Sequence, residues 1–433
     1  MRWFSLLVTS GLLAASPLLA KSDEWPKWLG PNGDGISHEQ ITDHWPAGGP
    51  RKVWERKVGY GFSSPIGFEG RVYLFAQQGR NDTLTAFDAE TGNVVWSQSY
   101  VGTIPADMTQ AKNASNGLPL PLATPAIDNG RIYSYGGGGD LVCRKLADGG
   151  EVWHTNVLKE TGAQILAWNE ASSPLVTEKF VYVQGGRNGP TAVAVDKATG
   201  KIAWNSEAHT IGGYAAPIIA DVDGTKQLII FAGDALYGMN PDTGRTIWGT
   251  PWQTDFNVNA STPIYRDHHL FISSDYDRGA MMLTLSPTGA KEDFKEADKA
   301  IALRFQPAIL DGQYLYCNSA GTLKCANWPD LKMQWENRLR LGDGGTIVRA
   351  GDLLITLSER GKLGLVRATP LGAQVLSQVP LFDFGTTWSM PLIYHGKLYA
   401  MGADTLVCLD LGARTASASD HSDAALSQAS KNC

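Results

Sequence analysis

The feature that most constrains this chain is a short motif that recurs eight times. Each copy has small residues before a proline, or a close variant, followed by an alternating aliphatic or Tyr-bearing segment typical of a β-strand. With about 45 residues per copy, the spacing predicts an all-β, eight-bladed β-propeller of four-stranded antiparallel blades. The motifs are Ser63-Ser64-Pro65, Ala123-Thr124-Pro125, Ser173-Pro174, Ala216-Pro217, Thr262-Pro263, Gln306-Pro307, the proline-less Gly345-Thr346 and Met390-Pro391.

A tryptophan near the end of most repeats gives a second signal. It stands ten positions after a small residue, which leaves room for an indole ring, and often follows a Thr-Gly turn such as Thr91-Gly92. Repeats five and seven lack the tryptophan and have Leu283 and Leu365 near the small position, with Val375 ten after Leu365, so we expect the volume of the pair to be conserved. The five complete pairs are Ala86 and Trp96, Cys143 and Trp153, Ala194 and Trp204, Gly238 and Trp248, and Cys325 and Trp335.

The last repeat ends without its tryptophan strand, whereas Val53-Trp54 near the start of the chain is a strand without a repeat. Propellers must close their ring to avoid exposed sheet edges. We therefore predict that the N-terminal strand completes blade eight and places Trp54 on Cys408.

The regions outside the repeats suggest an exported protein. Residues 1–20 are predicted to be a signal peptide rather than a membrane anchor, because the apolar run is short and Pro17 lies near its end. We expect residues 21–52 to be a leader segment packing on the propeller, residues 53–412 to be the propeller, and residues 413–433 to be a disordered tail. These assignments predict a periplasmic or secreted location and no transmembrane span after signal cleavage.

Composition narrows the classes of partner. The net charge is −6, which leaves little basic surface to neutralise phosphates and excludes nucleic acid as a partner. The 48 glycines, 14 tryptophans and 14 tyrosines suit short strands joined by tight turns.

Three of the five cysteines, Cys143, Cys325 and Cys408, occupy the small position of the repeat, so we interpret them as buried apolar groups. Cys317 and Cys325 could face each other across a hairpin, and the sequence leaves a disulfide between them open. We expect residues 100–122 to form a surface loop. The charged segment 290–300 is predicted to be either a short exposed helix or a solvated decoration of blade five.

Candidate ligand-binding residues lie just before the repeat starts, because the innermost strand of a propeller blade begins at the central channel. They combine aromatic rings, amides and an opposed charge pair, which suits a flat or polar ligand. Alternatively, these residues fill and hydrate the channel. The candidates are Trp168, Asn169, Glu170, Tyr214, Asn259, Arg304 and Trp388, with Phe62, Asn257 and Gln306 beside them.

On these repeats and on the opening Trp25-Pro26-Lys27-Trp28-Leu29-Gly30-Pro31, residues 25–412 resemble the PQQ-binding-like propeller family. This family is related to quinoprotein alcohol dehydrogenases and to the propeller subunit of the outer-membrane barrel-assembly machinery. The resemblance implies that the repeat tryptophans tie neighbouring blades together.

The resemblance implies two functions. In a quinoprotein dehydrogenase, PQQ would stack on Trp388 or Trp168, and Glu170 with Asn169 or Asn259 would hold Ca²⁺. The adjacent cysteine pair of such enzymes is missing here. We therefore favour a non-catalytic binding or assembly scaffold in the bacterial envelope, with no cofactor, no metal and a protein, peptide or glycan partner.

Overall fold

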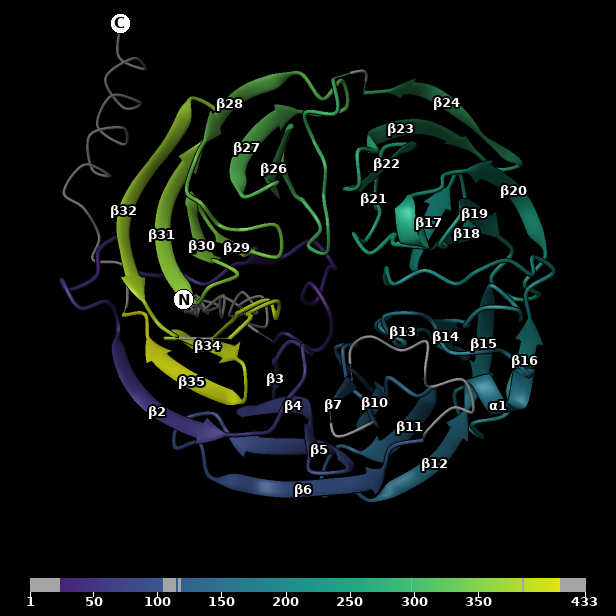
Figure 1. Cartoon of the computed structure of the whole chain (residues 1–433), viewed down its shortest axis with the longest axis horizontal. Coiled ribbons are helices and arrows are strands. Elements are labelled where there is room, and N and C mark those ends of the chain that lie inside the picture. Colours follow the sequence, from purple (N-terminus) through teal and green to yellow (C-terminus); the bar gives the residue numbers. More distant parts are fainter. Residues whose placement is uncertain (1–23, 104–113, 116–117, 297, 384, 413–433) are drawn as a thin grey trace, which may run out of the picture.

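The computed structural model describes residues 24–103, 114–115, 118–296, 298–383 and 385–412. Eight antiparallel blades of four strands surround a central channel, as Figure 1 shows, so the predicted eight-bladed propeller is confirmed. The predicted signal peptide and tail lie outside the described residues. Within them, no helix is both long and apolar enough for a membrane crossing.

The first four blades follow one another along the chain. The small hairpin of β7 (Ala114–Ser115) and β8 (Leu118–Pro119) lies between blades one and two, the short helix α1 (Val157–Thr161) between blades two and three, and the short helix η2 (Asp255–Asn257) between blades four and five. The blades are β3 (Ile66–Phe68), β4 (Arg71–Gln78), β5 (Asn81–Asp88) and β6 (Val94–Val101); β9 (Ala126–Asp128), β10 (Arg131–Tyr135), β11 (Asp140–Lys145) and β12 (Glu151–Asn156); β13 (Leu175–Val176), β14 (Phe180–Gln184), β15 (Ala192–Asp196) and β16 (Ile202–Asn205); and β17 (Ile218–Val222), β18 (Thr225–Phe231), β19 (Ala235–Met239) and β20 (Thr246–Pro251).

The remaining blades complete the ring. Blade seven carries a fifth strand, β1 (Ile36–Ser37), which pairs in parallel with its innermost strand. The blades are β21 (Ile264–Arg266), β22 (His269–Ser274), β23 (Gly279–Ser286) and β24 (Gly289–Lys295); β25 (Ile309–Asp311), β26 (Tyr314–Ser319), β27 (Thr322–Asn327) and β28 (Met333–Asn337); β29 (Thr346–Ala350), β30 (Leu353–Leu357), β31 (Lys362–Thr369) and β32 (Gly372–Pro380); and β33 (Leu392–Tyr394), β34 (Lys397–Gly402), β35 (Thr405–Asp410) and β2 (Arg51–Lys57).

Each repeat start lies within two residues of an innermost strand. Pro65 directly precedes β3, Pro391 directly precedes β33, and Gly345 takes the same place before β29. Proline lacks a backbone N–H and is therefore tolerated at the entrance of a strand rather than in its middle. The motif thus marks where the chain enters each blade at the channel.

The predicted ring closure is confirmed. Strand β2 is the outer strand of blade eight, and Trp54 lies opposite Cys408 in the antiparallel ladder. The five other predicted pairs also lie opposite each other, each followed by a shift of register in the outer strand. A small residue across from each indole therefore gives the ring room to lie flat on the sheet.

The six repeat tryptophans each connect their blade to the next one around the ring. The indole N–H of Trp54 donates to the carbonyl of Ala89 in blade one at 2.9 Å. Equivalent bonds of 2.8–3.0 Å join blades one to two, two to three, three to four and six to seven. Trp248 differs because Gln227 relays its bond: the indole donates to the amide oxygen, and the amide nitrogen donates to Ser286 of blade five. Trp54 thereby joins blade eight to blade one.

The detailed expectation was wrong by one position in blade five and, for the partner of Leu365, by two positions in blade seven. In blade five the small position is occupied by Met282, which faces Phe294. In blade seven Leu365 faces Ser377 rather than Val375. Leu283 lies one residue further along. The reason is turn length: both hairpins close with two residues, so the paired positions are twelve rather than ten residues apart.

The structure decides two questions that the sequence left open. Segment 290–300 is not a helix, because its first half forms β24, the outer strand of blade five, with its backbone paired to β23. Cys317 and Cys325 form no disulfide: Cys317 lies opposite Lys324, Cys325 lies opposite Tyr316, and both are free thiols. Burial raises the pKa of Cys325 to about 11, consistent with an apolar structural role.

Residues 24–50, the leader, run across one end of the channel. Trp25 exchanges two backbone hydrogen bonds with Gly67 of blade one, and the Trp28 indole donates to Thr262 at the start of blade five. The leader then reaches blade seven through β1 and blade eight through Glu39, which accepts bonds from the backbone of His395 and Gly396. Contacts with blades on opposite sides of the ring place Trp28 across the channel.

The contact between each tryptophan and the next blade predicts a position-specific cost of adding one methyl group. Gly92 and Gly130 both have a left-handed backbone, with φ of 67° and 70°. A Cβ on Gly92 would lie 2.5 Å from the Trp54 ring, whereas a Cβ on Gly130 would meet nothing within 4 Å. We expect Gly130→Ala to cost about 1 kcal/mol of backbone strain and Gly92→Ala to cost about 1–3 kcal/mol more.

Urea unfolding of both variants beside the parent protein measures this difference. Equal losses of unfolding free energy would show that Trp54 does not constrain the turn of blade one.

Candidate functional site

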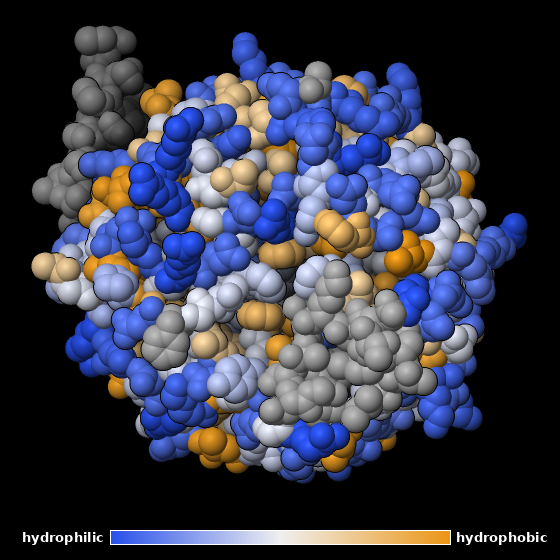
Figure 2. Space-filling model, in the orientation of Figure 1, coloured by the Kyte–Doolittle hydropathy of each residue, from blue (hydrophilic) through white to orange (hydrophobic). Residues whose placement is uncertain are grey.

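A cavity of about 310 Å³ lies in the channel, and the leader borders it through Trp28. We call it the mouth cavity. Trp28 lines it and also lines a second cavity of about 430 Å³ beneath the leader, so the indole separates the two spaces. The face in Figure 2 is hollowed near its centre. Six further aromatic rings line the mouth cavity: Phe62, Trp168, Tyr214, Tyr276, Phe305 and Trp388.

Trp388 is held firmly at the wall between blades seven and eight. Its indole N–H donates to Glu359 Oε1 at 2.8 Å, and its carbonyl accepts a bond from Gln306 Nε2 at 2.7 Å. Phe62 and Phe305 flank the ring, with centroid distances of 4.5 and 4.8 Å. A Cβ on Gly344 would come within 2.3 Å of the indole, so only glycine permits this approach.

Of the described residues that line the mouth cavity, Arg304 is the charged one. Asp275 accepts bonds from its Nε and Nη2 at 2.6 Å, and Asp343 accepts one from its Nη1 at 2.8 Å. The guanidinium also lies 5.4 Å from the centre of the Tyr276 ring. Burial alone would lower the pKa of Arg304, but the two carboxylates outweigh it and raise that pKa.

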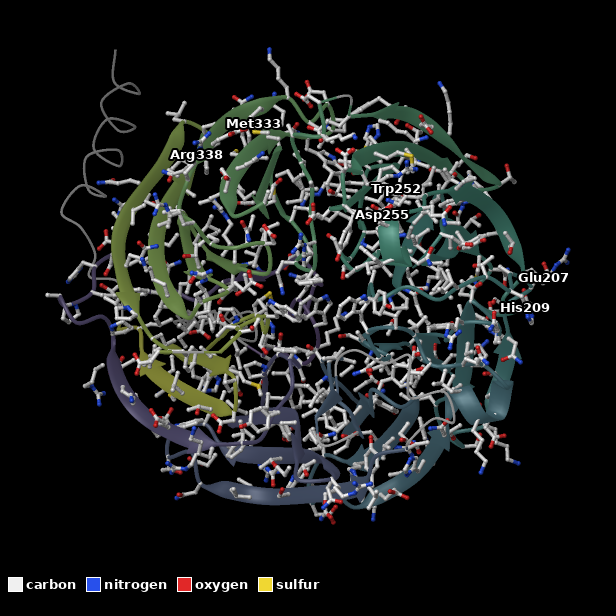
Figure 3. The ribbon with its side chains drawn as sticks, in the orientation of Figure 1. Glu207, His209, Trp252, Asp255, Met333 and Arg338 are labelled. Atoms are coloured by element: carbon white, nitrogen blue, oxygen red, sulfur yellow. The ribbon has the colours of Figure 1, made fainter. Side chains whose placement is uncertain are left out.

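A strained aromatic residue lies beside this wall. Phe256 in η2 has a φ of 64°, an uncommon value for a bulky residue, and its side chain is exposed. Its ring meets Tyr276 edge-on, at a centroid distance of 6.1 Å. Figure 3 labels Asp255, the neighbour of Phe256, well inside the outer rim of the ring. Phe256 therefore forms an exposed lip next to the cavity.

The structure brings some of the predicted residues to the cavity and leaves others in the scaffold. Trp168, Tyr214, Arg304 and Trp388 line it, as do Phe62 and Gln306. The other predicted residues, Asn169, Glu170, Asn257 and Asn259, are not among the lining residues.

The residues proposed as calcium ligands have structural partners. The Asn259 amide nitrogen donates to the carbonyls of Ala232, Gly233 and Trp252, and its oxygen accepts a bond from Ser274. Glu170 is fully buried and accepts a bond from the Leu166 backbone. The side-chain amide of Asn259 therefore joins the loops between blades four and five through its hydrogen bonds.

The charged groups described at the mouth are bonded to one another rather than grouped around an open position for a metal. Among the residues described, no group of three or more His, Cys, Asp and Glu side chains is placed to hold a metal. The carboxylates nearest the wall are bonded to Arg304 or Trp388. An anionic quinone would also meet Arg304 with its charge already compensated by two aspartates.

Sequence reasoning missed several residues of the site. Trp28 was assigned to the leader without a position over the channel. Asp275, Tyr276, Asp277 and Arg278 were not among the candidates. Asp275 pairs with Arg304, Asp277 pairs with Lys299, and the guanidinium of Arg278 lies 4.5 Å from the centre of the Trp252 ring. Tyr276 is thereby left facing the cavity.

With this geometry in place, comparison with known proteins identifies the family. The family model described as outer membrane protein assembly factor BamB matches residues 39–115 and 115–337, more than half of the chain. The chain belongs to this BamB-like family. No curated protein sequence is significantly similar to it.

Solved structures show that the BamB-like fold is shared widely. BamB from Moraxella catarrhalis has a TM-score of 0.60 at 16% identity, with 83% of this chain and 97% of that chain covered. A quinohemoprotein alcohol dehydrogenase from Comamonas testosteroni has a TM-score of 0.64 at 14% identity, with coverage of 92% and 82%. The designed Ika8 protein has a TM-score of 0.57 at 10% identity, with coverage of 83% and 98%. At these identities the likeness establishes the propeller fold alone, and function must be argued from the residues of the site.

A buried acidic pair lies between blades one and two of this BamB-like propeller. Asp82 of β5 is almost fully buried, and burial together with the nearby Asp140 raises the pKa of Asp82 to about 7. Burial also acts to raise the pKa of Asp140, but bonds from His154, Asn156 and Thr103 outweigh it and hold that pKa below the usual value. One carboxyl of the pair is thus neutral under mildly acidic conditions while the other stays charged.

This pair predicts a pH-dependent stability. An acid whose folded-state pKa is raised above its unfolded value of about 4 stabilises the fold at low pH, and that contribution is lost as the pH rises from about 4 to about 7. We expect Asp82→Asn to remove this loss, so its advantage over the parent should grow through that window by up to about 1.4 kcal/mol per pH unit.

Urea unfolding at a series of pH values measures the advantage. Asp88→Asn is the control: Thr91 holds the pKa of exposed Asp88 below its usual value, so removing that carboxyl should not reproduce the trend. An Asp82→Asn advantage that stays constant from pH 4 to 7 would contradict a raised pKa.

Proposed function

We propose that this BamB-like propeller is an exported, non-catalytic binding scaffold of the bacterial envelope, and that its mouth cavity holds a segment of a protein or peptide partner without a cofactor. The observation that carries the proposal is the composition of the cavity. Six aromatic rings form its walls, Trp28 lines one side of it, and the charged groups beside it are already bonded to one another. Such a site offers contact area and shape rather than a reactive group.

The engagement of the carboxylates described at the mouth supports binding over oxidation. A dehydrogenase needs a carboxylate or similar group within reach of the alcohol proton. At this mouth, Asp275 and Asp343 hold Arg304, and Glu359 accepts a bond from Trp388. Breaking any of these contacts to free a base would also disturb the wall that positions the ligand.

A peptide fits the lining better than a glycan. Glycan sites combine aromatic surfaces with several side chains that bond to hydroxyl groups. Here the polar lining residues are few, and Gln306 and Thr262 already bond to Trp388 and Trp28. Aromatic side chains, in contrast, are the usual anchors of protein interfaces because they bury much area at little entropic cost.

Peptide binding is expected to depend on the wall around Trp388. Isothermal titration calorimetry of the full chain with capped extended peptides from an outer-membrane β-barrel protein provides the measurement. Trp388→Leu should weaken binding by about tenfold or more, because it removes a central aromatic surface. Phe294→Leu is the matched control, since that ring lies on the outer strand of blade five.

A parallel titration examines the enzyme alternative. PQQ with Ca²⁺ should show no stoichiometric binding, and a dye-linked assay with primary alcohols should show no oxidation above the protein-free rate. Tight PQQ binding that is lost in Trp388→Leu, or turnover of an alcohol, would replace the scaffold proposal with the dehydrogenase.

A further inference from the structure

The mouth cavity has aromatic walls, and in the ion-pair cluster beside it the carboxylates outnumber the single guanidinium; from this we infer the chemistry of its occupant. We propose that the anchor is the cationic side chain of a lysine or arginine in the partner polypeptide. This inference rests on the proposed function and adds to it the chemical class of the group that is recognised.

The aromatic walls provide the first part of the argument. The negative face of an aromatic ring attracts a cation within about 6 Å of its centre, and the attraction grows as water is excluded. This cavity already contains such a contact, because the Arg304 guanidinium lies 5.4 Å from the Tyr276 ring. The rings of Phe62, Phe305 and Trp388 form a second cluster of neighbouring aromatic groups that line the cavity. A second cation can therefore be enclosed without displacing the first.

The distribution of charge provides the second part. Three carboxylates, those of Asp275, Asp343 and Glu359, contact the wall residues, against the single guanidinium of Arg304. All three guanidinium nitrogens already take part in these ion pairs. An incoming anion would find no uncompensated cation and would face the excess carboxylates. An incoming cation would meet both the ring faces and a favourable field.

The lip next to the cavity provides the third part. Phe256 is 64% exposed and has the left-handed φ of 64°. An exposed phenylalanine in this conformation destabilises the fold in two ways: the backbone is strained, and apolar surface is left in water. Its edge-on contact with Tyr276 places it beside the entrance, and Asp255 next to it is exposed. A polypeptide whose side chain enters the cavity would cover this ring, and Asp255 adds one more carboxylate to the rim.

The size of the cavity limits what can enter. A volume of about 310 Å³ lies at the lower end of the range for ligand sites, which suits one long side chain and excludes a folded element. Trp28 of the leader lines one side of the cavity, held there by its bond to Thr262. The partner backbone must therefore stay outside, across the lip, while a single side chain is inserted.

Peptides that differ at one position provide the experiment. Capped nonapeptides carry Arg, Lys, citrulline or Glu at a central position within an otherwise identical neutral sequence, and binding to the full chain is measured by calorimetry. Citrulline has nearly the shape of arginine without its charge. We expect the Arg and Lys peptides to bind about tenfold or more tightly than the citrulline peptide, and the Glu peptide to be weakest. Free choline at the same concentration tests whether the charge alone suffices, and we expect it to bind more weakly than the peptides.

Matched variants of the protein locate the effect. Asp343→Asn should reduce the preference for Arg over citrulline several-fold, since it removes one carboxylate from the wall. Glu207→Gln should leave the preference unchanged, because Glu207 lies at the outer edge of the ring in Figure 3. The preference in the parent should also weaken as salt is raised from about 0.05 to about 0.5 M. These concentrations bracket the physiological ionic strength, at which the screening length is about 8 Å.

The outcomes separate this inference from the proposed function. Equal binding of the Arg, citrulline and Glu peptides, still lost in Trp388→Leu, would overturn the cationic anchor and leave the scaffold standing. Choline binding that outcompetes the peptides would also overturn the peptide anchor. Absence of binding by every peptide, together with tight binding of PQQ, would overturn both.

Discussion

The structure depends on one contact that is repeated around the ring: an indole lies flat against a small residue of its own blade and donates its N–H to a carbonyl of the next blade. Burying an indole stabilises the fold by several kcal/mol, because apolar surface is removed from water. The indole N–H must then find a hydrogen-bond partner in place of water. The turn of the neighbouring blade supplies that partner, and a glycine in the turn, such as Gly92 beneath Trp54, lets the backbone approach the ring. Each contact therefore fixes the angle between two blades, and blade eight obtains its contact from the N-terminal strand.

Where this contact is altered, the same requirement is met by other means. Between blades four and five, Gln227 extends the reach of Trp248 by accepting its N–H and donating to Ser286. Blade five replaces the indole with Phe294, which needs no hydrogen-bond partner, opposite Met282. The ring thus tolerates loss of the tryptophan provided that no polar group is left buried without a partner.

The sequence was sufficient to predict what depends on local spacing. The repeat starts follow from a distance along the chain that recurs in every blade, and the tryptophan pairs, including Trp54 with Cys408, follow from one that recurs in six of the eight. Prediction failed where a turn changed length, as in the hairpins containing Pro287 and Pro370, because a two-residue difference shifts the register without changing the apolar pattern. It also failed for the charged strand β24, since an outer strand is exposed on most of its surface and resembles a surface helix in composition.

For the site, sequence position predicted which residues approach the channel but not which way each side chain points. Trp168 lines the cavity, whereas its neighbours Asn169 and Glu170 turn into the scaffold, where Asn169 adopts a left-handed backbone. Trp28 could not be placed because its position depends on a bond to Thr262, 234 residues away.

The ring and the mouth are linked through these same long-range contacts. A propeller channel is open at both ends unless something crosses it, and an open channel lined with aromatic rings would fill with water and bind little. By crossing from blade one to blade five, the leader places the Trp28 indole between the mouth cavity and the second cavity, where it covers part of the channel. A side chain that shields a site from water strengthens both the contact of rings with a ligand and the field of nearby carboxylates. The leader is therefore as much a part of the site as the residues at the mouth, although it contributes a single side chain to it.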